Sequence, residues 1–171
     1  MHPEVNDHIE SVKLKYPDYF ENKKVLEVGS LDINGGIRHH FKNCDYTGFD
    51  LGEGKGVDVV MPIHKFHTIG KYDVVISTEM LEHDKYWKLS LRVMYNLLKK
   101  DGLFVLTCAA PERKEHGTTY CDRDNSPFTN DYYQNVSIED FYTILPPTYF
   151  SYCEIKYGRE QQDLYFYGTK K

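Results

Sequence analysis

Apolar residues along this chain fall into short runs, separated by segments in which apolar and polar positions follow a helical spacing. The run at residues 72–77 is continuously apolar at its centre, and such continuity is typical of a strand covered on both faces. Further strands are expected at residues 25–28, 46–50, 57–60 and 103–107. A final antiparallel hairpin is indicated by two apolar runs that flank the polar stretch GREQQD, at residues 149–157 and 164–169.

Helical spacing is clearest at residues 81–100, where one apolar stripe recurs at intervals of four, three and four residues. Shorter helices are expected at residues 4–15, 34–41 and 137–144, the last of them capped by Ser137. Strands that alternate with helices predict an α/β fold. We therefore expect a doubly wound, mostly parallel seven-stranded sheet, with helices on both faces and an antiparallel C-terminal hairpin.

The length of 171 residues is enough for one domain with a real core and too short for two of ordinary size. We expect a single domain over residues 1–171, in which residues 1–22 form an N-terminal helix and lead-in. Residues 109–136 are polar, aromatic and unperiodic. A loop of that length is usually functional, so it is expected to bind substrate or to act as a lid.

Composition and charge argue against several classes of protein. No stretch of about 18 consecutive apolar residues is present, which excludes a membrane span, and the polar start MHPEVNDHIE predicts a cytoplasmic protein. The four cysteines lie far apart, which favours structural thiols over a zinc or redox site. A formal charge of −5 and a pI near 5.9 disfavour nucleic acid as a partner.

Candidate ligand-binding residues follow three of the predicted strands, at the edge where such sheets bind ligands. The first strand ends in EVGS, in which Gly29 permits close approach of a ligand to the backbone. The second ends in Asp50, where a carboxylate can accept hydrogen bonds from two ribose hydroxyls. The fourth ends in STE, which begins at Ser77. The ordered set predicts a ribose-containing cofactor, either NAD or S-adenosylmethionine.

The glycine spacing discriminates between these two cofactors. A pyrophosphate is bound by a G-x-G-x-x-G turn at a helix N-terminus, and here Leu31 fills the second glycine position. S-adenosylmethionine has no phosphate, so a site for it can dispense with that spacing. The turn therefore favours S-adenosylmethionine, and an NAD-binding oxidoreductase is the alternative.

Four segments in the order VLEVGSLDINGG, YTGFDLGEGKGVDVV, YDVVISTEMLEH and GLFVLTC resemble the class I S-adenosylmethionine-dependent methyltransferases, a Rossmann-like family. The resemblance covers about residues 23–109, and the expected terminal hairpin agrees with the antiparallel last strand of that family. The likeness is greatest to small stand-alone methyltransferases with a first motif L-E-V-G-S-x-D-x-N-G. Those proteins carry E-H-G-T in the loop after strand five, and here that loop reads RKEHGTTYCDRDNSPF.

The resemblance implies a set of cofactor-binding residues, in which Pro62 departs from the family, since many members carry an Asp there that accepts the adenine amine. Backbone groups or His64 would have to take its place. Glu27, Gly29 and Ser30 would line the methionine part of the cofactor, and Ser77 and Thr78 would meet its amino acid group. Asp50 would hold the ribose. The adenine would be flanked by Leu51, Met61, Pro62 and Ile63.

Two histidines are candidates for acid–base chemistry on the methyl acceptor. His83, in LEHD, is expected mainly to hold its loop, whereas His116, in KEHG, is expected to orient the acceptor or to take its proton. His64 and His67 lack a carboxylate cluster, so no metal is predicted. The absence of a [DNS]-P-P-[YFW] motif after the fourth strand, and of a Pro-Cys pair, disfavours amino-directed nucleic-acid methylation and cytosine C5 methylation.

Tyr120, Tyr132 and Tyr133 lie in the long loop among several Asp and Asn side chains, a composition that suits a sugar or another polar small molecule. The sequence thus predicts an S-adenosylmethionine-dependent methyltransferase that acts on a polar small molecule or glycan, at an oxygen atom. Besides the oxidoreductase, a methyltransferase-like module that binds the cofactor or a partner without catalysis is a further alternative.

Overall fold

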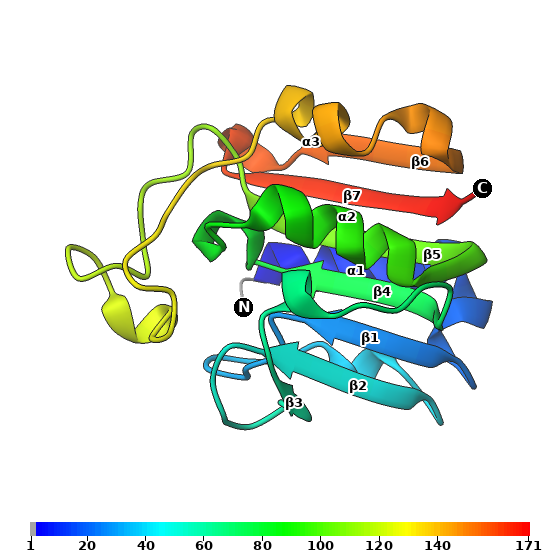
Figure 1. Cartoon of the computed structure of the whole chain (residues 1–171). Coiled ribbons are helices and arrows are strands. Elements are labelled where there is room, and N and C mark those ends of the chain that lie inside the picture. Colours follow the sequence, from blue (N-terminus) through cyan, green and yellow to red (C-terminus); the bar gives the residue numbers. More distant parts are fainter. Residues whose placement is uncertain (1–2) are drawn as a thin grey trace.

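A seven-stranded sheet runs through the protein, whose computed structural model describes residues 3–171 (Figure 1). The strands lie in the order β3-β2-β1-β4-β5-β7-β6. β1 to β5 pair in parallel, whereas β7 is antiparallel to both of its neighbours. The strands are β1 (Lys24–Val28), β2 (Asp45–Asp50), β3 (Val59–Val60), β4 (Tyr72–Thr78), β5 (Leu98–Ala109), β6 (Phe150–Tyr157) and β7 (Asp163–Lys170).

Helices cover both faces of this sheet (Figure 1). The helix α1 (Pro3–Lys15) lies on one face, and α2 (Trp87–Leu97) and α3 (Ile138–Ile144) lie on the other. The helix α3 begins with a capping box, in which the Ser137 hydroxyl accepts the backbone N–H of Asp140 at 3.0 Å. The predicted α/β fold, its doubly wound sheet and its antiparallel hairpin are confirmed.

The continuous apolar run of β4 is explained by two hydrophobic layers, one on each face of the sheet. Val75 is fully buried in the layer that includes Leu91 of α2. Val74 and Ile76 point the other way, into the layer that includes Ile9 of α1. Burial of such a side chain is worth about 1.5–3 kcal/mol, so β4 is held from both sides at the centre of the sheet.

The predicted helix at residues 34–41 is wrong, because only Arg38–His40 form a single 3-10 turn. The carboxylate of Asp32 accepts a 2.8 Å hydrogen bond from the backbone N–H of Gly35, and Gly35 has a φ of +114°. A side chain that bonds the local backbone, next to a glycine in a conformation outside the helical region, competes with helix formation. The segment after β1 therefore stays an open loop.

The predicted helix at residues 81–100 is also shorter in the structure. Leu81–His83 form a separate 3-10 turn, and the carboxylate of Asp84 then accepts the backbone N–H of Tyr86 at 2.7 Å, which delays the start of α2 to Trp87. At the other end, Leu98 pairs with Tyr72, so the chain has already entered β5. Pairing with a neighbouring strand outweighs the helical pattern there.

The third strand begins at Val59 rather than at residue 57. The backbone N–H of Val57 bonds the carbonyl of Gly54 at 3.1 Å, and Gly56 has a φ of +89°. This turn occupies the residues that were expected to begin the strand. It also brings the Asp58 carboxylate to the backbone N–H of Gly48, at 2.8 Å.

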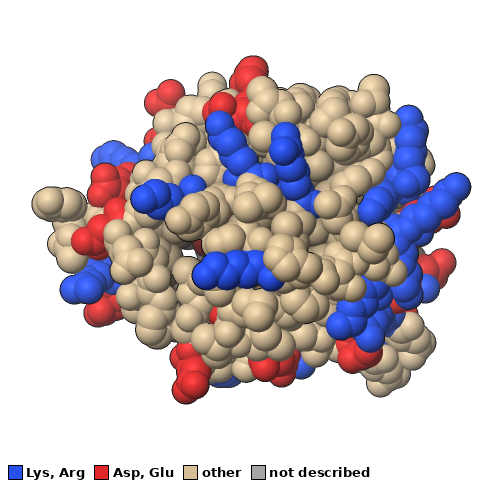
Figure 2. Space-filling model, viewed as in Figure 1, with Lys and Arg blue, Asp and Glu red and all other residues tan. Residues whose placement is uncertain are grey.

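Charged side chains are distributed unevenly over the face that carries α2 and α3. Figure 2 shows Lys and Arg side chains gathered at the end of the sheet opposite the long loop, while the loop itself carries both signs. Within residues 3–171, no helix combines the length and the apolar character needed to cross a bilayer.

Candidate active site

A cavity of about 960 Å³ opens at the carboxyl ends of the parallel strands. Its wall is formed by the segments that follow β1, β2, β3 and β4, together with residues 125–132 of the long loop. Figure 1 shows that this loop projects beyond the same end of the sheet. The volume is at the upper end of the range for small-molecule sites, so one cavity has room for a cofactor and an acceptor.

Eleven of the twelve residues that the sequence singled out line this cavity, and Ser77 is the exception. Ser77 is fully buried, and its hydroxyl donates a 2.8 Å hydrogen bond to the carbonyl of Val28. The side chain of Ser77 thus joins β4 to β1 and does not face the cavity, and its expected contact with the cofactor stays a prediction. The eleven lining residues are Glu27, Gly29, Ser30, Asp50, Leu51, Met61, Pro62, Ile63, Thr78, His83 and His116.

The turn after β1 brings its backbone against the cavity. Gly29 has a φ of +82°, a left-handed conformation that glycine adopts without strain. A Cβ atom at this position would lie 2.7 Å from the Cβ of Met80, so contact with Met80 also requires a glycine here. The Oγ of Ser30 is buried without a hydrogen-bond partner. An unpartnered polar atom in a cavity wall is suited to bind a ligand.

Every backbone N–H of this turn, from Gly29 to Ile33, already has an acceptor within the protein. Those of Gly29 and Ser30 share the carbonyl of Phe49, at 2.9 and 3.1 Å, and that of Leu31 reaches the carboxylate of Asp50 at 3.0 Å. The backbone N–H groups of Asp32 and Ile33 bond the carbonyls of Lys55 and Leu31, respectively. The turn therefore offers no row of N–H groups to a pyrophosphate, which weakens the dinucleotide alternative.

Glu27 is a nearly fully buried carboxylate in the cavity wall, and the hydroxyl of Tyr46 donates a 2.8 Å hydrogen bond to it. Burial raises the pKa of Glu27 to about 7, while the bond from Tyr46 and the charge of Arg38 act in the opposite direction. Glu27 is thus poised between its neutral and ionised forms near neutral pH. A cationic group of a ligand would favour the ionised form.

Asp50 ends β2 and links two loops of the cavity wall. Besides the bond from Leu31, its carboxylate accepts the backbone N–H groups of Leu51 at 2.7 Å and of Gly52 at 3.3 Å. These bonds fix the orientation of the carboxylate. Because each carboxylate oxygen can accept more than one hydrogen bond, ligand hydroxyls can still be bound.

The segment after β3 forms an apolar part of the wall. Ile63 belongs to the main hydrophobic layer and Met61 packs against it, while Pro62 precedes the 3-10 turn Ile63–Lys65. His64 lies in that turn, with its ring centroid 4.5 Å from the ring of Tyr86, and both side chains line the cavity. His64 and His67 do not share a helix, so the spacing considered for a metal site is not realised.

His83 and His116 lie together at the loop side of the cavity, with ring centroids 5.0 Å apart and planes nearly perpendicular. The ring of Tyr133 packs against both, at 5.4 and 5.0 Å. Burial lowers the pKa of His83 to about 4 and also lowers that of His116, so both rings are neutral at neutral pH. The Nδ1 of His116 lies 3.1 Å from the carbonyl of Lys114, to which it must donate, so Nε2 keeps a lone pair.

Two glutamates, the half-buried Glu79 and the fully buried Glu82, accompany this histidine pair. Glu79 lines the cavity and accepts a 2.8 Å hydrogen bond from the hydroxyl of Thr107. Glu82 is fully buried next to His83 and does not line the cavity. Burial raises the pKa of both carboxyl groups, and the charge of Glu79 adds to the shift at Glu82. Sequence reasoning assigned no role to Glu82, because nothing in the segment LEHD shows that this side chain turns inward.

Residues 110–136, which we call the lid, rest on the cavity through close contacts at two glycines. A Cβ atom on Gly52 would lie 2.0 Å from the ring of Phe128, so the lid touches the loop after β2 there. A Cβ atom on Gly117 would lie 2.8 Å from Cε1 of His83. Figure 2 shows an opening between the side chains of the lid and the rest of the protein.

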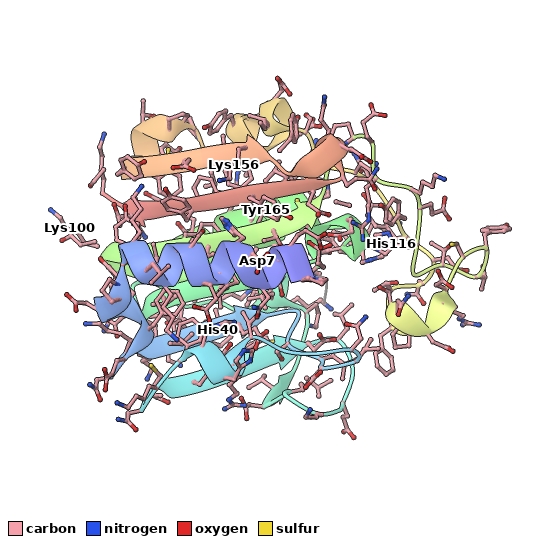
Figure 3. All side chains as sticks on the ribbon, turned by 180° about the vertical axis from the view of Figure 1, so that it is seen from behind. Asp7, His40, Lys100, His116, Lys156 and Tyr165 are labelled. Carbon is pink, nitrogen blue, oxygen red and sulfur yellow. The ribbon has the colours of Figure 1, made fainter. Side chains whose placement is uncertain are left out.

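The three tyrosines of the lid have different environments. Tyr132 lines the cavity, Tyr133 packs against the histidine pair, and the ring of Tyr120 is 91% exposed. The expected surface of aromatic rings is therefore not continuous. Figure 3 shows His116, within the lid, at the end of the sheet opposite Lys100.

The cavity also contains residues that sequence reasoning did not assign to it. Met80 and the segment that follows β4 contribute to the wall, as does Phe128 of the lid. Phe128 offered one signal, since it is an apolar residue in an otherwise polar stretch. The position of Met80 depends on the contact with Gly29, which only the folded chain creates.

Comparison with known proteins gives a family and a fold. A family model described as a methyltransferase domain matches residues 10–134. No curated protein sequence gives a significant match. Among solved structures, similarity is found to 1,6-didemethyltoxoflavin-N1-methyltransferase from Burkholderia thailandensis, with a TM-score of 0.67 and 13% identity, over 96% of this chain and 78% of that one.

Two further structures show the range of similar proteins. An S-adenosylmethionine-dependent methyltransferase from Archaeoglobus fulgidus matches with a TM-score of 0.63 and 16% identity, over 96% of this chain and 94% of that one. Phosphoethanolamine N-methyltransferase 2 from Haemonchus contortus matches with a TM-score of 0.66 and 14% identity, over 96% of this chain. The chain spans 53% of that protein.

Proposed function

Because this chain belongs to the methyltransferase domain family, we propose that it transfers the methyl group of S-adenosylmethionine to an oxygen atom of a polar small molecule or glycan. The observation that carries this proposal is the convergence of eleven predicted residues, from segments far apart in the sequence, on one cavity. The family supports methyl transfer, and the chemistry of the cavity wall supports the proposed placement of the cofactor and the proposed acceptor.

The cavity wall suits the successive parts of S-adenosylmethionine. The buried carboxylate of Glu27 and the unpartnered Oγ of Ser30 would bind the charged methionine end. Asp50 would accept hydrogen bonds from the ribose, and the adenine would lie against Met61 and Ile63. When bound, the cofactor supplies a methyl group on a positively charged sulfur.

The acceptor would lie on the lid side of the cavity, beside His83 and His116. As the acceptor oxygen bonds the methyl carbon and the carbon–sulfur bond breaks, the acceptor proton would pass to Nε2 of His116, whose lone pair is free of the Lys114 contact. His83 would act as a positioning residue, because it packs against the ring of His116.

An oxygen acceptor is proposed because a hydroxyl must lose a proton during transfer and neutral histidines line the cavity. The similar structures include N-methyltransferases, so the fold alone does not select the acceptor atom. Tyr132 and the polar residues of the lid favour a polar acceptor that offers several hydrogen-bonding groups.

Calorimetric titration with S-adenosylhomocysteine and with NAD tests the cofactor. Saturable binding of S-adenosylhomocysteine is expected, without binding of NAD, and the reverse result would overturn the proposal. A screen of hydroxylated small molecules and oligosaccharides, with homocysteine release as the readout, then tests catalysis. Cofactor binding without turnover on any class of acceptor, amines included, would favour a module that binds without catalysis.

A further inference from the structure

Three side chains that can bind a metal ion come together where the lid meets the body of the protein. One ligand atom from each of Glu82, His83 and His116 lies within 4.8 Å of the other two. A first-row transition metal bound at about 2.1 Å holds its ligands within about 4 Å of one another. A small rotation of the half-buried His116 ring would therefore complete the arrangement.

The buried atoms of this cluster have few hydrogen-bond partners. Both carboxylate oxygens of Glu82 and the Nδ1 of His83 are buried and make no hydrogen bond within normal distance and angle limits. Backbone groups of Ala109 and Tyr132 lie close enough to influence Glu82 and His83, respectively, without forming such bonds. Glu82 is fully buried and His83 is 6% exposed. Leaving such groups unpaired costs free energy, and a carboxylate more than a neutral group. A cation between them would satisfy all three atoms at once.

The charges around the cluster also favour a cation. Glu79 and Asp163 are the nearby carboxylates that act on the buried groups, and Arg113 is the nearby cation. Arg113 is paired with Asp163 at 2.9 Å. On binding a divalent ion, the carboxyl groups of Glu79 and Glu82 would release their protons, and the two negative charges would then balance the ion.

We propose that Glu82, His83 and His116 bind a divalent transition-metal ion of the Zn²⁺ class. Two imidazoles and one carboxylate suit such an ion, whereas Mg²⁺ and Ca²⁺ prefer oxygen ligands throughout. The three side chains differ in their position relative to the cavity. Glu82 lies behind the cavity wall, whereas both histidines line the cavity. A fourth coordination position is therefore open towards the cavity, as in catalytic rather than structural zinc sites.

The open coordination position extends the proposed function to activation of the acceptor. Only this part of the proposal rests on the proposed function. An acceptor hydroxyl bound to the ion would have a lowered pKa and would lose its proton to solvent before the methyl transfer. With the ion in place, Nε2 of His116 would be a ligand rather than the proton acceptor. A hydroxyl, phenol or carboxyl acceptor fits this position.

The ion would also fasten the lid. The end of the lid is already attached to the same segment, since the backbone N–H of Gln134 donates to the carbonyl of Glu82 at 2.8 Å. Among the residues that the structure describes, His116, near the start of the lid, contacts the rings of His83 and Tyr133 and the carbonyl of Lys114. Coordination by His116 would join this part of the lid to Glu82 and His83, and should protect exposed Arg123 from trypsin.

The test uses the full chain after treatment with a chelator. Calorimetry with Zn²⁺ should show one site per chain, and Co²⁺ should give visible d–d absorption. His116→Ala and Glu82→Gln should each weaken binding by at least about tenfold, and Zn²⁺ should slow tryptic cleavage at Arg123 only in the wild type. His64→Ala is the matched control for metal binding, because it removes another histidine of the cavity that lies outside the cluster.

Absence of saturable Zn²⁺ binding in the wild type would overturn the proposal. Equal affinity for Zn²⁺ in the wild type and in His116→Ala would also overturn it, because the ion would then be bound by other side chains. If Glu82→Gln does not fold, His116→Ala decides the matter, because that residue is in the lid. Titration of the chelated protein with S-adenosylhomocysteine separates the two proposals: cofactor binding with no metal binding contradicts only the metal site.

Discussion

The hydroxyl of Tyr46 on β2 donates a 2.8 Å hydrogen bond to the carboxylate of Glu27 on β1, in the wall of the cavity. Burial raises the pKa of Glu27, and this bond is the largest influence that lowers it. The pair therefore sets the pH at which Glu27 becomes negatively charged, and this leads to two predictions.

Tyr46→Phe should raise the pKa of Glu27 above its value of about 7, because the bond that favours the ionised form is lost. If ionised Glu27 attracts the positively charged end of the cofactor, affinity should weaken as the pH falls through about 7 in the wild type, and at a higher pH in the variant. Calorimetry with S-adenosylmethionine over a pH series measures this. The same pH profile in both proteins would exclude Glu27 from cofactor binding.

Glu27→Gln should increase stability at alkaline pH. With a pKa of 4.5 in the unfolded chain and about 7 in the fold, the contribution of Glu27 is fully present below pH 4.5 and is lost as the pH rises through 7. Gln cannot ionise, so the variant should gain about 1–3 kcal/mol in unfolding free energy at about pH 8 and little at about pH 5. Urea unfolding at both pH values is the measurement, and a difference independent of pH would contradict this account.

Asp50→Ala should weaken binding of S-adenosylhomocysteine by at least tenfold, because hydrogen bonds to a charged group are worth about 1.5–3 kcal/mol each. The same change removes the bonds from Leu31 and Leu51, so some stability is lost as well. Asp58→Ala is the matched control, since that carboxylate also accepts a backbone N–H, from Gly48, but does not line the cavity. Equal loss of affinity in both variants would indicate a purely structural role.

Phe128→Ala should open the lid, because the ring of Phe128 is the contact that meets Gly52 across the cavity. We expect faster dissociation of the cofactor by several-fold, with little change in unfolding free energy, since lids gate exchange with solvent. Stopped-flow displacement measures the rate. Tyr120→Ala, which removes an exposed aromatic ring of the same lid, should leave it unchanged. An identical rate in Phe128→Ala would show that this contact does not gate the cavity.

His116→Ala should lower turnover by about 10²–10⁴ and leave cofactor affinity nearly unchanged, if this side chain takes the acceptor proton or holds the ion that activates the acceptor. A smaller loss that appears in the acceptor KM as well as in kcat would indicate that His116 only orders the lid. Full activity would remove His116 from the chemistry. Added Zn²⁺ separates the two active roles, because only the ligand role makes the wild type depend on metal.

The turn at Gly29 shows what a local sequence pattern can predict and what it cannot. The sequence placed this glycine at the end of a strand and disfavoured a phosphate-binding turn, and in the folded chain each N–H of the turn is bonded internally. The pattern did not show that Met80 packs against Gly29. Loss of cofactor binding in Gly29→Val would therefore reflect a clash with Met80 as much as a block of the cofactor.

The sequence by itself determined the order of the strands, the helices α1, α2 and α3, the coverage of both faces of β4, and the strand ends that carry the candidate ligand-binding residues. These features follow from local periodicity and from the rule that parallel strands end at one edge. Only the tertiary structure decided that Ser77 bonds Val28 and that Glu82 meets His116. Such contacts join residues that no periodicity relates, and they arise from burial and hydrogen bonding between segments that are adjacent only after folding.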